Sequence, residues 1–522
     1  MKSERKPLAF STTMRNPERI AGFLNCIMAY EKKVLTNDII YSVITKLIKS
    51  KLYKPTRLTN EEKNIYRYDD LHFTDAQARA IINRNPQKHG EKGFDYGWPS
   101  RFHTMYKLPM ELGFVYYAMN KPIKISETGH MLIDAYNTIP IDNNKIMNVM
   151  LNSMVKYHTN NPFRRNLNAN IPLALLLKIL KKLKNEKSEN GAGIYRQELP
   201  LLICWPNDDE NALYDFIINI RKLYKFNYSN EYIYNICLAL LGADETKKKR
   251  FKMSQICDEC VDEYIRKMRS TGIITLRGNG RFIDFNTFES NKIDYILDNY
   301  LEIKKFSNEK EYYNYVSTID VNIISVVNKN IRSDLRESVK AKKLKELSST
   351  YTKEQIFNEL KSVCKKYETK DLLFKYISAP TRLEFLICIS LLQNYKNIDI
   401  KPNYVADDEG LPTFTAGGDK PDIECYDENC DSFFEVTLMC GRQDQVNNEI
   451  IPIRRHLINH KKIRNNSFSV LVAPVIHVDT KESAKWYKHK DNIDILTYDI
   501  EEYIKNISST DEPIQLLNID KV

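Results

Sequence analysis

Ala416-Gly417-Gly418-Asp419-Lys420-Pro421-Asp422-Ile423 is the stretch that sets the architecture of the C-terminal part of this chain. Residues 421–427 and 433–439 alternate as β-strands do, and the loop 428–432 joins them. A hairpin of these strands places Asp422 beside Glu435. Two clustered carboxylates repel each other, and a hard divalent cation is the common reason for them to coexist. Magnesium is the ion that we expect here.

The segments around this hairpin predict the rest of a C-terminal α/β unit. We expect an apolar helix over 381–393, a strand over 398–405, a helix over 444–462 with an irregularity at Pro452, and a buried strand over 468–476. The order α-β-β-β-α-β indicates a mixed sheet flanked by helices. The predicted fold class is thus α+β and multidomain, with a mostly helical N-terminal region and a C-terminal α/β domain.

A magnesium ion held by Asp422 and Glu435 would bind a scissile phosphate and activate a water, which is the task of a phosphodiesterase. In the spacing Pro-Asp…Glu-x-Lys the lysine normally supplies a cation beside that water, but Thr437 stands in its place. Glu384 lies in the apolar helix 381–393, where a carboxylate needs a partner or a site. An exposed carboxylate in the first helical turn is the alternative for Glu384.

Donors able to hold a phosphate surround the same region. Gly417-Gly418 permits a close approach of the backbone, and Arg442-Gln443 follows the strand of Glu435 directly. Arg454-Arg455-His456 comes one helix later, although for Arg455 and His456 a solvated helix face is the favoured interpretation.

The N-terminal part has the order of elements of a winged helix, in which one helix enters the major groove of DNA. Thr74-Asp75-Ala76-Gln77 has the spacing of a capping box and predicts a helix to about residue 82. Ser100 is expected to cap a helix to about residue 112, and a short hairpin begins at residue 114. Candidates for DNA contacts are Arg101, His103 and Lys107 in the helix from Ser100, and Arg79, Arg84 and Lys88 near it.

A second module repeats this order. A helix is expected over 253–270, and two β-rich segments within 273–285 are joined by a turn with Asn279-Gly280 at its centre. Arg277 and Arg281 flank the tip and suit a wing against phosphate, with a solvated surface hairpin as the alternative. The predicted domains are two winged-helix-like modules over 1–150 and 151–303, a helical linker over 304–370 and a nuclease-like domain over 371–522.

Composition limits the class of protein. With 42% hydrophobic and 28% charged residues in 522, the chain can build cores and is not a disordered scaffold. The net charge of +10 favours a polyanionic partner. No apolar run reaches the ~20 residues of a membrane span, and no secretory signal opens the chain, so we expect a cytoplasmic protein with no membrane partner. The ten cysteines are expected to be reduced and mostly buried, the pair Cys257 and Cys260 within a helix.

Several blocks, in order, resemble the AlwI family of type IIS restriction endonucleases. They are Phe10–Arg19, Trp98–Phe102, Ala379–Leu386, Asp407–Pro412, Ala416–Ile423, Phe434–Leu438, Gly441–Gln443 and Pro452–Leu457. The resemblance implies a PD-(D/E)XK nuclease fold and Mg²⁺-dependent cleavage of double-stranded DNA at a fixed offset from a short asymmetric site, leaving 5′-phosphate ends. It implies that Asp422, Glu435 and Glu384 are metal ligands.

Thr437 departs from the lysine of the general motif, and Lys420, Arg442 or Gln443 is the hypothesis for the group that orients the water. Two alternatives remain: a non-catalytic winged-helix DNA-binding protein with a degenerate nuclease domain, and a nicking or repair-type endonuclease of the same fold. One active site per chain leaves double-strand cleavage to a second protomer or a second event. A companion DNA methyltransferase belongs to such a system as a functional partner.

Overall fold

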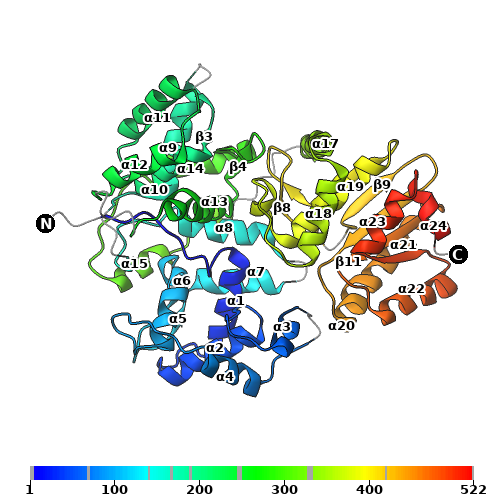
Figure 1. Cartoon of the computed structure of the whole chain (residues 1–522), viewed down its shortest axis with the longest axis horizontal. Coiled ribbons are helices and arrows are strands. Elements are labelled where there is room, and N and C mark those ends of the chain that lie inside the picture. Colours follow the sequence, from blue (N-terminus) through cyan, green and yellow to red (C-terminus); the bar gives the residue numbers. More distant parts are fainter. Residues whose placement is uncertain are drawn as a thin grey trace. The chain divides into compact units, whose positions relative to one another are not determined.

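The computed structural model describes residues 5–67, 71–138, 141–164, 168–186, 191–243, 250–325, 333–417 and 420–519. The chain forms two compact units (Figure 1). Unit 1 comprises residues 1–58 and 73–329, and unit 2 comprises residues 59–72 and 330–522. No helix within the described segments has the length and apolar character that a membrane crossing requires.

Unit 1 is mostly helical. Its helices are α1 (Pro17–Met28), α2 (Asn37–Lys49), α4 (Asp75–Arg84), α5 (Trp98–Tyr106), α6 (Leu108–Glu111), α7 (Glu127–Asn137), α8 (Asn143–Met154), α9 (Pro172–Asn185), α10 (Leu199–Cys204), α11 (Glu210–Tyr224), α12 (Asn230–Leu240), α13 (Cys260–Arg269), α14 (Ser290–Asn299), α15 (Glu309–Val316) and α16 (Val321–Ile324). Its strands are β1 (Val115–Tyr116), β2 (Lys124–Ile125), β3 (Ile194–Tyr195), β4 (Ile274–Arg277) and β5 (Phe282–Phe285). Strands β1 and β2 pair antiparallel, as do β4 and β5, so both predicted hairpins are present.

Of the helices of this unit, the sequence predicts those near residues 74–82, 100–112 and 253–270, and one of these starts is wrong. The Thr74–Gln77 capping box is confirmed in α4. Ser100, in contrast, does not cap a helix, because α5 already begins at Trp98 and Ser100 lies buried in its first turn. Its hydroxyl donates to the Asp95 carbonyl at 2.8 Å and accepts from the Glu91 amide at 2.9 Å. The predicted helix over 100–112 is also divided, into α5 and α6.

Unit 2 contains a five-stranded mixed sheet. Its strands are β6 (Asp399–Pro402), β9 (Ile423–Tyr426), β10 (Asp431–Val436), β11 (Ser467–Ala473) and β12 (Ile495–Asp499), and β7 (Val405–Ala406) and β8 (Pro412–Phe414) form a separate small hairpin. The sheet order is β12-β11-β10-β9-β6. Strands β10, β11 and β12 run parallel, and β9 pairs antiparallel with both β10 and β6. The predicted mixed sheet is confirmed.

Helices cover both faces of this sheet (Figure 1). The helices of unit 2 are α3 (Asn60–Arg67), α17 (Ser333–Thr350), α18 (Lys353–Cys364), α19 (Ala379–Asn394), α20 (Arg442–Gln445), α21 (Ile451–Lys461), α22 (Val478–Asp491), α23 (Ile500–Ser508) and α24 (Leu516–Ile519). Helices α19 and α23 contact one another and the sheet, whereas α21 and α22 pack on β11 and β12. Ile450, Ile453 and Leu457 form a buried core with Phe433 and Leu471 on the second of these faces.

The helix predicted over 444–462 is a single run with one irregular turn. Helix α20 passes through a π-turn, Val446–Ile450, into α21. Pro452 at the start of α21 lacks an amide hydrogen and its ring collides with the carbonyl four residues earlier in a regular helix. The wider π-turn accommodates this proline, and it adds a residue to the turn without ending the helix.

The state and burial of the cysteines agree with the sequence-based prediction. All ten cysteines are free, and most of them are buried. Cys257 lies in a π-turn that leads into α13, whose first residue is Cys260, so both belong to one helical run.

A buried ion pair gives a test of unit 1. The Arg221 guanidinium donates to both carboxylate oxygens of Glu198 at 2.7 and 2.6 Å, and neither side chain is exposed. We expect Glu198→Ala to lower the free energy of unfolding in urea by about 3–5 kcal/mol, because it leaves a buried charge uncompensated. Glu210→Ala, which removes a partner of Lys178 at the surface, should cost less than about 1 kcal/mol. Equal costs for the two variants would contradict this account.

Candidate active site

Asp422 and Glu435 lie side by side, as the sequence predicts. The last pair in the β9–β10 ladder is Ile423 with Phe434, and the two acidic residues occupy the next position on each chain. The Val436 amide donates to Asp422 Oδ2 at 2.8 Å, and the Asp422 amide donates to Glu435 Oε2 at 3.2 Å. These reciprocal bonds hold both carboxylates at the end of the hairpin.

Glu384 joins this pair from helix α19. The helix is buried along most of its length, and Glu384 itself is only 2% exposed. Its Oε2 accepts a hydrogen bond from the Ala416 amide at 3.2 Å. Burial, and then the charge of Asp422, raises the pKa of Glu384 well above its usual value. An exposed carboxylate in the first helical turn is therefore the wrong interpretation of Glu384.

A fourth carboxylate, Glu449, was missed by the sequence analysis. It lies in the π-turn Val446–Ile450, and the Thr437 hydroxyl hydrogen-bonds to it. Burial and the nearby Asp422 raise the pKa of Glu449 to about 8. Burial and the nearby Glu449 raise the pKa of Glu435 to about 8 as well. The sequence shows only an acidic residue three positions before Pro452. It does not show toward which side of the helix the Glu449 side chain points.

His456 also faces this group. Its Nδ1 lies 3.4 Å from Glu435 Oε1, and its side chain is 15% exposed. The interpretation of His456 as part of a solvated helix face is therefore wrong, whereas Arg455 is exposed as expected. The positive form of His456 lowers the pKa of Asp422, against the larger raising effects of burial and of Glu435.

The other residues predicted beside the water are exposed and interact with other groups or with none of the carboxylates. Arg442 is exposed and forms an ion pair with Asp479, and Gln443 is exposed. Lys420 is exposed and its charge acts on Glu424. Gly418 and Asp419 lie outside the described residues.

The donor chemistry of this group suits a hard cation. Glu384, Asp422 and Glu435 offer carboxylate oxygens, and burial followed by a neighbouring carboxylate raises the pKa of each, so a positive charge bound there would favour the ionised forms. Across the segments that the structure describes, no three His, Cys, Asp or Glu side chains are already arranged to ligate one ion. Each of the three carboxylates instead accepts a bond from a backbone amide.

The model of the AlwI restriction endonuclease family matches residues 110–343 and 316–506. This chain belongs to the AlwI restriction endonuclease family. It is therefore a site-specific deoxyribonuclease, and DNA is its partner.

Solved structures with similarity to this AlwI-family chain are also restriction endonucleases. The small subunit of the heterodimeric restriction endonuclease R.BspD6I is 18% identical, covers 32% of this chain and 86% of its own, and has a TM-score of 0.27. The restriction endonuclease FokI is 12% identical over 98% of this chain and 96% of its own, with a TM-score of 0.24. FokI bound to DNA is 12% identical over 99% and 97%, with a TM-score of 0.22. No curated protein matches.

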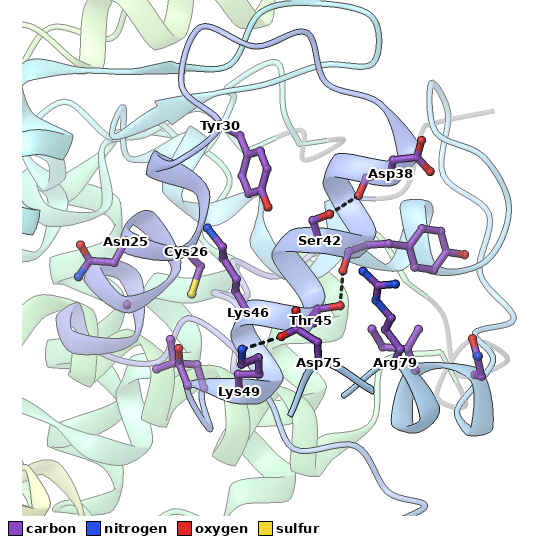
Figure 2. Close-up of a pocket in the computed structure, with 16 residues that line it drawn as sticks. Asn25, Cys26, Tyr30, Asp38, Ser42, Thr45, Lys46, Lys49, Asp75 and Arg79 are labelled. Carbon is purple, nitrogen blue, oxygen red and sulfur yellow. Dashed lines mark hydrogen bonds and ion pairs between the residues drawn. The ribbon is translucent and has the colours of Figure 1, made fainter. Parts of the chain in front are cut away.

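Three of the candidate DNA-reading residues, Arg79, Arg101 and Lys107, line two hollows in unit 1. Arg79 lines a cavity of about 1060 Å³ together with Lys46 and Lys49. Figure 2 shows Lys49 bonded to Asp75 there, and Lys46 lies 4.7 Å from the centre of the Tyr30 ring.

The second hollow joins two of the sequence blocks that resemble the family. Arg101 and Lys107 line a cavity of about 380 Å³ together with residues 10–13. Ser11 donates a hydrogen bond to the Met105 carbonyl at 3.3 Å, which ties the N-terminal block to helix α5. Arg101 Nε is buried without a hydrogen-bond partner among the described residues.

The remaining candidates lie outside these two hollows. His103 stacks on Phe94 at 4.4 Å between ring centres, and burial lowers its pKa to about 4. Arg277 forms an ion pair with Asp284 across the hairpin at 2.9 Å. Arg281 is exposed and its Nε donates to the Gly278 carbonyl, and Arg84 and Lys88 are exposed.

The raised pKa of Glu449 predicts how stability depends on pH. The unfolded carboxyl ionises near 4.5, while the folded one keeps its proton to about 8. This group therefore stabilises the fold fully at low pH, and that stabilisation is lost as the pH rises toward 8. We expect Glu449→Gln, in EDTA, to show a smaller fall in Tm between pH 5.5 and 8.5 than the wild type, and to be about 1–2 kcal/mol more stable at pH 8.5.

Glu482→Gln on helix α22 is the matched control, because Glu482 is exposed. It should reproduce the wild-type pH dependence. A Glu449→Gln variant that also reproduced it would show that the pKa of this carboxyl is not raised by its surroundings.

Proposed function

We propose that this chain is a type IIS restriction endonuclease that binds a short asymmetric site in double-stranded DNA and hydrolyses phosphodiester bonds at a fixed offset, with Mg²⁺. The observation that carries this proposal is the grouping of Glu384, Asp422 and Glu435 at one end of the sheet in unit 2. The residues proposed to read DNA belong to unit 1, so reader and cutter are parts of different compact units. That division is what cleavage outside the bound site requires.

Asp422, Glu435 and Glu384 would hold the magnesium ion. When bound, it supplies positive charge at the phosphate and lowers the pKa of the attacking water. The water oxygen bonds to phosphorus as the bond from phosphorus to the 3′ oxygen breaks, which leaves a 5′-phosphate and a 3′-hydroxyl. The backbone amides of Val436 and Ala416 keep two of the carboxylates pointing to this place.

Reading of the site is assigned to the two winged-helix-like modules over 1–150 and 151–303. Arg101 is the strongest candidate for a base contact, because a buried guanidinium nitrogen without a partner gains most from a hydrogen-bond acceptor. Arginine pairs in two places with guanine in the major groove. Arg79, Lys88, Lys107 and Arg281 are assigned to phosphate contacts, which position the duplex.

Thr437 is the residue that supports the alternative function, a DNA-binding protein that does not cleave DNA. A chain that lacks the motif lysine would bind DNA through unit 1 without cutting it if no other group served the water. Double-strand cleavage by an active enzyme would require a second protomer or a second event, and a companion methyltransferase would protect the host DNA. The first experiment therefore separates binding from cutting.

Purified protein is incubated with plasmid and bacteriophage DNA with and without Mg²⁺, and the ends are sequenced. We expect discrete fragments that depend on Mg²⁺ and are lost, by at least about 10³-fold in rate, in Asp422→Ala. Glu482→Ala, an exposed change in the same unit, should cut at the wild-type rate. DNA binding without breakage under any divalent ion would instead establish the non-catalytic alternative.

Arg101→Ala tests the reader separately. Loss of one two-point contact with a base costs about 1–3 kcal/mol of discrimination, so we expect cleavage to spread to sites that differ at one position, or to vanish. A cleavage screen on a library of randomised sites measures this. Lys222→Ala, an exposed change on α11, serves as the control. An unchanged site preference in Arg101→Ala would remove Arg101 from the reading residues.

A further inference from the structure

The proposed hydrolysis leaves one role unassigned, namely the group that stands where the motif has a lysine. Thr437 cannot fill that role through its own side chain. Its hydroxyl accepts a hydrogen bond from the Met439 amide at 3.1 Å and hydrogen-bonds to Glu449. A hydroxyl has a single hydrogen to donate and carries no positive charge.

The helical run from Arg442 to Lys461 brings other side chains to this place. It begins soon after β10 ends, and Gln445 fastens its first turn. Gln445 Nε2 donates to the Met439 carbonyl at 2.9 Å and to the Val475 carbonyl at 2.7 Å. Its Oε1 accepts from the His477 amide and the Thr480 hydroxyl. The run is therefore fixed to the ends of both β10 and β11.

The phase of this helical run determines which side chains face the carboxylates. Ile450, Ile453 and Leu457 are buried in the core on β10 and β11. Glu449 and His456 each precede one of these core positions and lie seven residues apart, which is about two helical turns, so they share a face. Glu435 is on the side of β10 that also carries Phe433, a member of the same core, because alternate residues of a strand share a face.

We propose that His456 takes the role of the missing lysine and holds the attacking water beside the scissile phosphate. This inference rests on the proposed function. The imidazole is 3.4 Å from Glu435 Oε1, whereas Lys420, Arg442 and Gln443, all within the described segments, form no hydrogen bond or ion pair with Asp422 or Glu435. Its side chain is partly exposed, so a phosphate and a water can reach it.

The neighbouring basic residues of α21 are engaged elsewhere. Arg454 donates to Asp491 at 2.5 Å, and Arg455 is exposed. His460 contacts Asp431 Oδ2 at 2.8 Å, at the opposite end of β10 from Glu435. His456 is therefore the basic group of this helix that reaches the active end of the sheet.

The presence of threonine at residue 437, where the motif has lysine, is consistent with the position of His456. A lysine at residue 437 would lie beside Glu449 and pair with it, whereas Thr437 binds Glu449 by a hydrogen bond and leaves the water to His456. The group that the motif supplies from the strand thus comes from the helix that follows it. His456 donates a hydrogen bond to the water. The bond that forms is still the one from the water oxygen to phosphorus, and the bond that breaks is still the one from phosphorus to the 3′ oxygen.

Three variants test this inference with DNA whose cleavage by the wild type has first been established. We expect His456→Ala to cut at the same positions about 10²-fold or more slowly, with DNA binding in EDTA and Tm unchanged. His456→Lys should keep most of the wild-type rate, because it restores a cationic donor at the same position. Thr437→Lys combined with His456→Ala should recover at least about a tenth of that rate, by returning the lysine to the motif. Lys462→Ala, an exposed change just beyond the same helix, is the control.

Two results would overturn the inference. One is a His456→Ala enzyme as fast as the wild type. The other is that all three variants lose the same share of the cleavage rate and also have a lower Tm than the wild type, which would show that His456 only supports the fold. Failure of the wild type to cut under any condition would count against the proposed function itself, and it is seen before the variants are compared.

Discussion

The electrostatic repulsion among buried carboxylates is the constraint on which the C-terminal unit depends. Glu384, Asp422, Glu435 and Glu449 come from a helix, two strand ends and a π-turn, and the pKa of each is raised, first by burial and then by a neighbouring carboxylate. A fold selected for stability alone would replace such a group with apolar side chains. Its retention in a restriction endonuclease is explained if a cation and a phosphate complete it.

The scaffold holds these charges with backbone amides and one well-bonded side chain. The amides of Val436, Asp422 and Ala416 each donate to a carboxylate oxygen, which lowers the cost of burial. Gln445 uses its whole amide group to fix the helix that carries Glu449 and His456. Rigid support of this kind keeps acidic side chains in place before any ligand arrives.

Proline and the π-turn link the core to the chemistry. Pro452 disfavours a regular helix, and the wider turn before it keeps Ile450, Ile453 and Leu457 in the core while Glu449 remains beside Thr437. Local π-turns are frequent at functional sites for this reason: they rotate a few side chains without breaking the helix. The sequence predicts an irregular turn at Pro452, but it does not predict which side chains that turn brings to the carboxylates.

Sequence alone determined what depends on neighbours along the chain. Alternation fixed the β9–β10 hairpin and hence the pairing of Asp422 with Glu435, and spacing fixed the capping box at Thr74 and the hairpin of β4 and β5. Tertiary structure decided the rest, because burial and helical phase depend on contacts between distant segments. It buried Glu384, brought Glu449 and His456 to the carboxylates, and directed Arg442 to Asp479. A helix start such as Ser100 was misjudged for the same reason, since its hydroxyl bonds to a preceding loop that the local pattern does not reveal.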